Sequence, residues 1–458
     1  GSDYSVAKLI KSFWKSSLFL SCQNVLAKKA ESLIVALRSS NWREIDGRFD
    51  RARRRFQDLL HMQQTSNTGN VARLAIAQAL SMTTMNVNII NTALVGSLLA
   101  PVAWLATLGL SLQFVASMLT TLPASLLMVR FGRRPVFIGG VLIAAFSACF
   151  QGIAIVIDHF VLFCAASMGL GIAHGCASFY RYAATDCASE AERPKAISYV
   201  LAGGLMAALF GPEIARNTVQ WVPDYLYAGC YFSVSVVQII ALLALVGVKI
   251  PKPVQSRSGG RPLGVFVKNP VYIVGMVCAA IGFSLMTYFM TATPLQVVNV
   301  SMLGTSANAT IIQWHVVAMF APSFFTGNLI QRFGIMKILS SGLIAYIVAI
   351  FVALFGDMFV HYFTALFLLG LGWNFLYIGG SALVARVATG EERGRVQGLA
   401  DLATMSLVAM ASLTAGGLHS QFGWGILVLA ACAPIAILAL ALVWLGIHRK
   451  KYATVVRS

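Results

Sequence analysis

The sequence predicts an all-α membrane protein in which twelve transmembrane helices form two six-helix pseudo-repeats. Three observations lead to this fold class. Of the 458 residues, 58% are hydrophobic and 11% are charged, whereas soluble domains carry roughly 25% charged residues. Apolar runs recur regularly from residue 71 onwards, each close to the ~20 residues that a bilayer span requires. The longest polar break follows the sixth run and divides the set into halves.

Residues 1–61 differ in composition from everything after them. Lysines alternate with apolar residues between 6 and 37, as in an amphipathic helix, and 41–60 is rich in arginine. The segment is too charged to span a bilayer, and its acidic residues argue against a targeting peptide. We interpret it as a cytoplasmic, amphipathic and basic extension, or as a fused segment that precedes a native chain beginning near Met62.

The predicted spans follow this extension in order. They cover residues 72–95, 102–128, 135–157, 160–184, 195–215, 225–248, 270–293, 307–330, 335–356, 360–386, 395–418 and 423–447. The N-terminal half is then 62–248, the polar cytoplasmic linker is 249–269, and the C-terminal half is 270–458.

Charge orients these spans. Basic residues follow every second span, and among them are Arg130, Arg193, Lys249, Arg332, Arg386 and Arg449. The alternate connections hold little beyond Asp158, Asp224 and Asp357. Because Lys and Arg concentrate on the cytoplasmic side of a membrane, both termini are predicted to be cytoplasmic. Basic loops also explain the net charge of +18 without a nucleic-acid partner.

An internal repeat supports the division into halves. Residues 125–132 read SLLMVRFG at the end of the second span, and residues 327–334 read GNLIQRFG at the end of the eighth. Both segments place Leu, Arg, Phe and Gly at equivalent positions of a cytoplasmic turn. Many secondary transporters consist of two such repeats, with the substrate site at the interface between them.

The first of these turns resembles the signature of the major facilitator superfamily, G-x-L-a-D-R-x-G-R-R. The matching residues are Leu127, Arg130, Gly132, Arg133 and Arg134. Val129 stands in place of the acidic residue and Ser125 in place of the first glycine. The resemblance implies the major facilitator fold, although the acidic residue that helps to lock the cytoplasmic gate in that family is absent. The residues assigned to the gating loops are Arg130, Gly132, Arg133, Arg134, Arg332 and Gly334.

A closer resemblance covers nearly all of residues 72–447. The stretches LQFVASMLTTLPASLLMVRFGRR, LMTYFMTATPL, IIQWHVVAMFAPSFFTGNLIQRFG and LLGLGWNFLYIGG are similar to the bacterial copper importers of the CcoA-like transporter family. Those proteins carry M-x-x-x-M in span 7 and H-x-x-x-M in span 8, which they need for copper uptake and for assembling cbb3-type cytochrome oxidase. The residues at those positions here are Met286, Met290, His315 and Met319. A related branch with a similar backbone moves riboflavin.

The chemistry of these four residues independently favours copper. Each pair has i, i+4 spacing, which puts both members on one face of a helix. Thioether sulfur prefers Cu(I), and imidazole also binds copper. At 1.5 Å per residue, the two pairs are expected at similar depth in the outer half of the membrane. The alternatives are that the methionines fill packing gaps and that His315 bonds to a neighbouring helix.

Other residues in the predicted spans are weaker candidates. Cys278, Met82 and Met85 are possible further soft ligands for the metal. The candidates for lining the transport cavity are Asn86, Asn88, His174, Trp314, Trp373 and Asn374. The two asparagines of the first span could instead bridge helices. Arg181 is expected to pair with Asp186 or with another acidic group near the cytoplasmic side.

Together these features predict a secondary transporter that imports copper, as Cu(I), across the bacterial cytoplasmic membrane by alternating access and supplies cytochrome oxidase assembly. The alternative is a transporter of riboflavin or another small organic solute within the same superfamily, and a third class is a membrane scaffold that moves nothing. The sequence has neither a Walker loop nor a catalytic triad, so we expect no enzyme activity. We expect a monomer in the lipid bilayer with copper as its substrate and no prosthetic group.

Overall fold

The computed structural model describes residues 42–188, 193–250, 261–388 and 392–448. The chain divides into two compact units, residues 1–66 and 67–458. The described residues form helices joined by short turns. Most of the predicted N-terminal extension and the middle of the predicted linker lie outside the described residues.

The first half runs from helix α3 to helix α9. Its helices are α3 (Trp42–Leu99), α4 (Leu108–Phe131), α5 (Arg133–Val156), α6 (Phe160–Ala177), α7 (Tyr180–Cys187), α8 (Arg193–Thr218) and α9 (Ala228–Val246), with a 3-10 turn η1 (Ala103–Leu105) before α4. Only the part of α3 from residue 67 belongs to the second unit.

The second half begins with a short helix and continues with longer ones. Its elements are α10 (Leu263–Val267), α11 (Pro270–Pro294), the π-helical turn η2 (Leu295–Val300), α12 (Thr305–Phe320), α13 (Ser323–Phe333), α14 (Ile335–Phe355), α15 (Phe359–Val387), α16 (Arg393–Ala430) and α17 (Cys432–Ile447). A 45° bend separates α12 from α13.

By length and composition, eight helical segments of the described residues can cross a membrane, or nine if the bent pair α12–α13 is one span. The predicted number of twelve is larger for identifiable reasons. Helix α8, which contains Arg193, Lys195, Glu213 and Arg216, is not among the eight. Three asparagines (Asn86, Asn88 and Asn91) lower the hydropathy of α3, which is not among the eight. Residues 395–447 count as one segment of 53 residues, although Gly423 breaks it with a φ of +76°. The all-helical fold agrees with the prediction, and the count of twelve stays a prediction.

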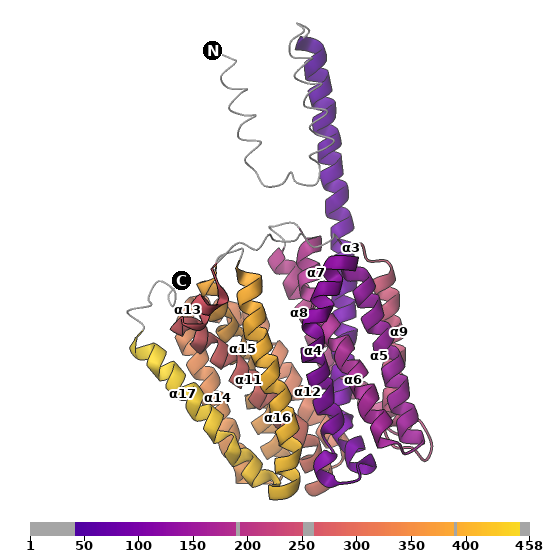
Figure 1. Ribbon diagram of the computed structural model, residues 1–458, viewed down its shortest axis with the longest axis vertical. Coiled ribbons are helices and arrows are strands. Elements are labelled where there is room, and N and C mark those ends of the chain that lie inside the picture. Colours follow the sequence, from indigo (N-terminus) through magenta and orange to yellow (C-terminus); the bar gives the residue numbers. More distant parts are fainter. Residues whose placement is uncertain (1–41, 189–192, 251–260, 389–391, 449–458) are drawn as a thin grey trace. The chain divides into compact units, whose positions relative to one another are not determined.

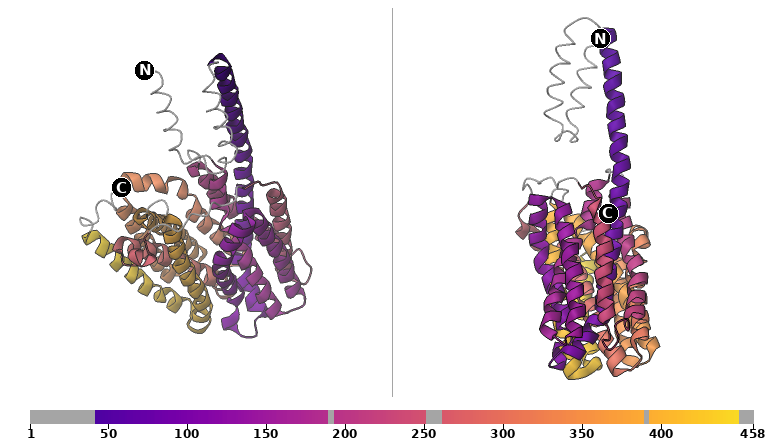
Figure 2. Two further views of the ribbon diagram at one scale, coloured as in Figure 1. Left: turned by 45° about the horizontal axis from the view of Figure 1, so that its top comes forward. Right: turned by 90° about the vertical axis from the view of Figure 1, so that its right-hand side faces the viewer.

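The helices of each half pack mainly on one another, and the two halves lie side by side within residues 67–458 (Figure 1; Figure 2). In the first half, α4 and α9 flank α5 and α6; in the second, α11, α12 and α14 all contact α15. Close approach depends on glycine: a Cβ on Gly275 would lie 2.8 Å from the Gly380 oxygen, and one on Gly380 would lie 2.5 Å from the Gly275 oxygen. Small residues allow such contacts between membrane helices. The halves meet where α4 contacts α16 and where α8 contacts α12.

The two repeated turns have the same conformation. Gly132 joins α4 to α5 with a φ of +91°, and Gly334 joins α13 to α14 with a φ of +85°. The guanidinium carbon of Arg130 lies 5.2 Å from the centre of the Phe131 ring, and that of Arg332 lies 5.3 Å from the Phe333 ring. The repeat seen in the sequence is therefore a repeat in geometry. We call the end of the bundle with these turns the basic end, and the end with Asp158, Asp224 and Asp357 the acidic end (Figure 1).

A substitution at Gly416 on α16 can test the packing between the halves. A Cβ there would lie 1.9 Å from the Thr107 Oγ1 and 2.8 Å from its Cβ. Thr107 is 2% exposed and β-branched, so its side chain has little freedom to move. We expect Gly416→Ala to destabilise the protein by about 1–3 kcal/mol through overpacking, measured as a lower midpoint of thermal unfolding in detergent.

The neighbouring glycine supplies the control for this prediction. A Cβ on Gly417 would meet nothing within 4 Å. Gly417→Ala should therefore leave the midpoint unchanged or raise it slightly, since alanine favours the helix. Equal midpoints for the two variants would contradict the packing described between α16 and Thr107.

Candidate functional site

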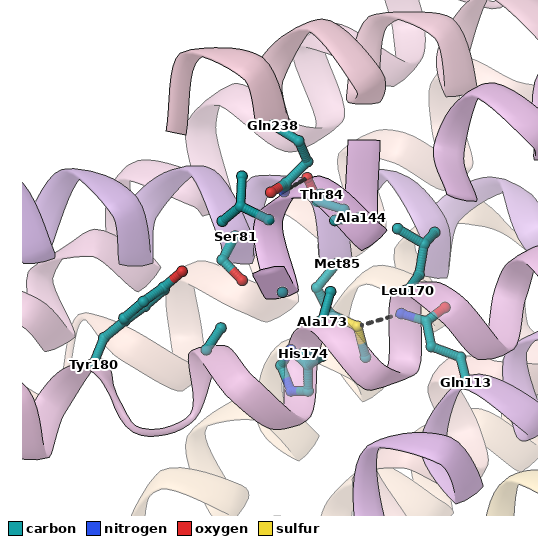
Figure 3. A pocket seen from close by; sticks show the side chains of 13 residues that line it. Ser81, Thr84, Met85, Gln113, Ala144, Leu170, Ala173, His174, Tyr180 and Gln238 are labelled. Carbon is teal, nitrogen blue, oxygen red and sulfur yellow. Dashed lines mark hydrogen bonds between the residues drawn. The ribbon is translucent and has the colours of Figure 1, made fainter. Parts of the chain in front are cut away.

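A cavity opens inside the first half, between α3, α4, α5, α9 and the α6–α7 segment (Figure 3). The atom-free space in and around it is about 320 Å³, which includes open solvent, and in the described conformation the enclosed part has room for little more than a water molecule. Its polar and sulfur-bearing lining residues are Ser81, Thr84, Met85, Gln113, His174, Tyr180 and Gln238. The lining contains no Asp, Glu, Lys or Arg, so the cavity suits a polar solute without a strong charge.

Two glutamines hold donors and acceptors in place around this cavity. The Gln238 Nε2 donates to the Thr84 Oγ1 at 2.6 Å, and the Gln113 Nε2 donates to the Met85 sulfur at 3.0 Å. The Gln113 Oε1 is buried and has no hydrogen-bond partner among the described residues. The Tyr180 hydroxyl points towards Ser81 (Figure 3). The unpaired oxygen of Gln113 is therefore free to accept a hydrogen bond from a bound solute.

Four aromatic residues form a cluster in the second half. We call Phe283 on α11, Phe320 on α12, and Trp373 and Tyr377 on α15 the aromatic cluster. The Trp373 and Tyr377 rings, one helical turn apart, stack with centroids 5.1 Å apart and planes 10° apart. Phe283 and Phe320 meet the Trp373 ring edge to face, at 5.5 Å and 5.9 Å. The Trp373 Nε1–H is buried without an acceptor among the described residues.

Arg181 connects the wall of the cavity to the aromatic cluster. It follows the cavity residue Tyr180 on α7, and its side chain crosses to the second half. There it forms a side-chain hydrogen bond with Tyr377 and an ion pair with Asp401 of α16 at 3.7 Å. Arg181 thus links α7, which carries the cavity residue Tyr180 in the first half, to the aromatic cluster in the second half.

The four predicted copper ligands are all buried in the core of the second half. Met286, Met290 and Met319 are 5%, 3% and 6% exposed, and His315 is fully buried. The His315 Nδ1 lies 2.6 Å from the Leu366 carbonyl oxygen. Because a carbonyl only accepts, this ring nitrogen carries the proton, and the buried Nε2 is left with a lone pair and no partner.

Helix packing constrains how these ligands meet. Helices α11 and α12 each pack closely against α15, and they contact one another much less. In the described residues, no group of three or more His, Cys, Asp or Glu side chains is arranged to hold a metal ion. Any copper site here would therefore depend on His315 and thioether sulfur, which suits a transported ion better than a resident one.

The additional soft ligands lie in different surroundings. Cys278 is fully buried in the same core as Met286 and Met290. Met85 lies in the first half, where it lines the cavity and its sulfur accepts a hydrogen bond from Gln113. Met82 is half-buried on the same helix. His174, predicted to line the cavity, does lie in its wall.

Asn86 and Asn88, which are predicted to line the transport cavity, are not among the residues that line the cavity described above. The Asn86 Nδ2 donates to the Ala207 oxygen at 2.9 Å, which ties α3 to α8. The Asn88 Nδ2 donates to the Thr84 oxygen, while its Oδ1 accepts from the Thr92 hydroxyl at 3.1 Å. Both amides are buried where water is absent, so they satisfy themselves on nearby protein groups.

Trp314 and Asn374, which are also predicted to line the transport cavity, are likewise not among its lining residues. Trp314 is 47% exposed and meets the Phe363 ring at 6.3 Å, on the outer surface of the bundle. Asn374 is fully buried at the α12–α13 bend: its Nδ2 donates to the Met319 oxygen and to the Ser323 hydroxyl, and its Oδ1 accepts from Thr326, each at 2.6 Å. A bend leaves backbone groups unpaired, and Asn374 supplies partners for them.

The gating-loop residues make contacts within their own halves. Arg133 pairs with Asp186 at 2.6 Å, and Arg134 donates to the Val246 oxygen. Arg181 is expected to pair with Asp186 or with another acidic group near the cytoplasmic side, and the acidic group it contacts is Asp401. Sequence reasoning missed Asp401 and Gln113; an acidic residue inside an apolar run was the available signal for Asp401.

The structural role of Asn374 can be tested directly. Asn374→Ala would leave the buried Met319 carbonyl and the Ser323 hydroxyl without this partner, whereas Thr326 keeps its bond to the Pro322 oxygen. The cost is about 1–3 kcal/mol for each unsatisfied group. We expect a lower midpoint of thermal unfolding, with an unchanged KM for the protein that remains folded. A raised KM at normal stability would restore Asn374 to the substrate path.

Comparisons with known proteins agree with this geometry. The family description "Major Facilitator Superfamily" matches residues 74–322 and 299–456. Over 366 residues the chain is 38% identical to the riboflavin transporter RfnT of Brucella anthropi, which covers 79% of the chain and 91% of that relative. It is 28% identical over 319 residues to the uncharacterized MFS-type transporter YddS of Bacillus subtilis, covering 64% of the chain and 70% of the relative.

Solved structures give the same fold. One is a bacterial homolog of the human lysosomal transporter Spinster in an inward-facing, unoccupied conformation, with a TM-score of 0.60 and 16% identity over 86% of this chain and 97% of that one. Another is the nucleoside transporter NupG, with a TM-score of 0.62 and 14% identity over 82% of this chain and 99% of that one.

Proposed function

We propose that this chain, which belongs to the major facilitator superfamily, imports a flat and uncharged heteroaromatic solute of the riboflavin type by alternating access. It is a multi-pass membrane transporter and not an enzyme. The observation that carries the proposal is the combination of a neutral polar cavity with the aromatic cluster, joined by Arg181. The 38% identity to a riboflavin transporter supports the same choice of solute and favours it over copper.

The physical chemistry of the site fits a flavin. A tricyclic ring can stack on Trp373 in place of, or beside, one of its aromatic neighbours, with about 0.5–1.5 kcal/mol of stabilisation beyond the area buried. Flavin carbonyl and imide groups complement the unpaired Trp373 Nε1–H and Gln113 Oε1. A site that offers unpaired polar groups discriminates strongly against solutes that cannot match them.

Contacts between the halves support alternating access. At the acidic end, the Ser412 hydroxyl on α16 lies 2.9 Å from the Ser111 hydroxyl on α4. The Asn308 Nδ2 donates to the Ile90 oxygen at 3.3 Å in the same region. With the basic end assigned to the cytoplasm, as the charge distribution predicts, the described conformation is closed towards the outside. Twelve spans, cytoplasmic termini and a bacterial cytoplasmic membrane belong to this proposal.

The aromatic cluster gives the test of the proposal. Trp373→Leu removes the stacking surface, and we expect it to raise the KM for riboflavin about tenfold, measured as uptake of labelled riboflavin by cells that cannot make the vitamin. Trp373→Phe keeps an aromatic ring but loses the N–H. Its KM for riboflavin should therefore lie between that of the unmodified protein and that of Trp373→Leu.

Trp314 supplies a matched control for this experiment. It is the same residue type on the outer surface of the bundle, so Trp314→Leu should leave the KM for riboflavin unchanged. Equal effects of the two leucine substitutions, or no uptake by cells with the unmodified chain, would reject the proposal.

Copper is the second candidate, because His315 keeps an unpaired ring nitrogen in a core that also contains Met286, Met290 and Met319. If copper is carried, His315→Ala and Met290→Leu should lower accumulation of radioactive copper at least tenfold, since each removes a ligand. Riboflavin uptake, measured in the same cells, should persist.

The control for copper is a methionine away from this core. Met410 is 63% exposed on α16, so Met410→Leu should not change copper accumulation. Copper accumulation equal to that of cells without the protein would remove copper from consideration.

A further inference from the structure

A glycine of the first half lies directly against the aromatic cluster. Gly204 is buried in α8, and a Cβ built on it would lie 2.7–2.9 Å from three carbon atoms of the Phe320 ring. Carbon atoms in contact normally lie about 3.5–4.0 Å apart. The Phe320 ring therefore packs on the backbone of α8, and its position depends on the absence of a side chain at residue 204.

Phe320 contacts both halves of the protein. It is the last residue of α12, and the Asn374 Nδ2 fixes the backbone just before it by donating to the Met319 oxygen at 2.6 Å. The Phe320 ring meets the Trp373 ring with centroids 5.9 Å apart and planes 64° apart. One half-buried side chain thus contacts Gly204 of the first half and Trp373 of the second.

Phe320 is also the member of the aromatic cluster that is held by the fewest partners. The Tyr377 ring stacks on Trp373, and its hydroxyl forms a hydrogen bond with Arg181. The Phe283 ring contacts both Trp373 and Tyr377, at 5.5 Å and 5.4 Å. Among the described residues, the ring contact of Phe320 is with Trp373. A flat solute that stacks on Trp373 therefore displaces Phe320 at a lower cost than the other two rings.

We propose that Phe320 is the ring that the solute displaces from Trp373, and that Gly204 is the positioning residue that determines how far this ring can move. The inference rests on the proposed function. The displaced ring is pressed towards α8, so the solute binds more tightly when α8 and α12 move apart. Gly204 thereby gives the first half a direct influence on a solute site whose rings all belong to the second half.

This contact links solute binding to the alternation of the halves. Helices α8 and α12 form one of the two main contacts between the halves. A ligand shifts a conformational equilibrium only by binding one state more tightly than the other. The difference between the states is here the room for Phe320 beside Gly204, because that room depends on the separation of the two helices.

The test measures riboflavin binding to the full-length protein in detergent, by quenching of the flavin fluorescence. Gly204→Ala pushes the Phe320 ring towards Trp373, so we expect the Kd for riboflavin to rise about tenfold. Phe320→Ala removes the ring that the solute must displace, so the Kd should fall about threefold. In a Phe320→Ala background, Gly204→Ala should change the Kd by less than about twofold, because the two residues act through one contact.

Uptake by cells that cannot make riboflavin gives a second measurement, which a purely structural role of Phe320 would leave unchanged for each folded molecule. We expect Phe320→Ala to lower the uptake rate at saturating riboflavin about fivefold despite its tighter binding, because binding no longer acts on the contact between α8 and α12. Tighter binding with slower uptake supports the proposal, whereas a raised Kd or an unchanged uptake rate overturns it.

Gly203→Ala is the matched control, because it makes the same change one residue earlier on α8. A Cβ on Gly203 would lie 2.9 Å from the backbone nitrogen of Ala79, within the first half. This variant should lower the midpoint of thermal unfolding and leave the Kd of the folded protein unchanged. Equal changes in Kd for the two glycine variants, or a Gly204→Ala effect that keeps its size in the Phe320→Ala background, would overturn the proposal.

Two further outcomes are distinguishable. If Gly204→Ala does not fold, recovery of folding in the double variant with Phe320→Ala supports the contact, and failure to recover overturns it. Absence of riboflavin binding by the unmodified protein would overturn the proposed function and this inference together. Riboflavin binding by the unmodified protein with additive effects of the two substitutions would overturn this inference alone.

Discussion

Water is absent from the hydrocarbon core of a membrane, so every polar group placed there must find its partner inside the protein. In the first half, Thr84, Asn88 and Thr92 recur at four-residue intervals on one face of α3, and they bond to Gln238, to each other and to the Tyr231 hydroxyl at 2.6–3.1 Å. In the second half, Asn374 supports the bend between α12 and α13. Each half is therefore tied together by its own polar groups and can move as a body.

Several buried polar atoms of the described residues are exceptions to this rule. A buried polar atom without a partner costs about 1–3 kcal/mol, and natural proteins hold few of them. Gln113, Trp373, His315 and Arg181 each leave one such atom unpaired. The same is true of Gln151, Arg133, Arg216, Thr287 and Asn308. An unpaired buried atom therefore marks a residue as a candidate for contact with a solute. Its position beside the cavity or the aromatic cluster is the further evidence that such a candidate requires.

Composition and residue spacing were sufficient to predict the fold class and the repeated turns. Apolar runs and basic turns predict an all-helical membrane protein, and the two R-F-G segments have the same geometry. Spacing along one helix could not distinguish Trp373, in the aromatic cluster, from Trp314 on the outer surface, because the neighbouring helices decide which face is buried. Helix α3 shows the same limit: its asparagines suggested a cavity, but Asn86 bonds to Ala207 of α8 and Asn88 bonds to Thr84 and Thr92 of its own helix. The pairing of Arg181 with Asp401 depends on the docking of the two halves, which no local pattern encodes.

The contacts between the halves are of a kind that can be exchanged for water at low cost. At the acidic end they are mainly neutral hydrogen bonds, such as Ser111 with Ser412 and Asn299 with Ser97, together with a bond from the Arg216 guanidinium to the Thr310 hydroxyl at 3.2 Å. A neutral hydrogen bond contributes only about 0.5–1.5 kcal/mol net, because water replaces it on separation. Towards the basic end, the ion pair that joins the halves in the described residues is Arg181–Asp401 at 3.7 Å, whereas Arg133 and Asp186 within the first half lie 2.6 Å apart. Short polar contacts within the halves and mostly neutral ones between them allow the halves to alternate without unfolding.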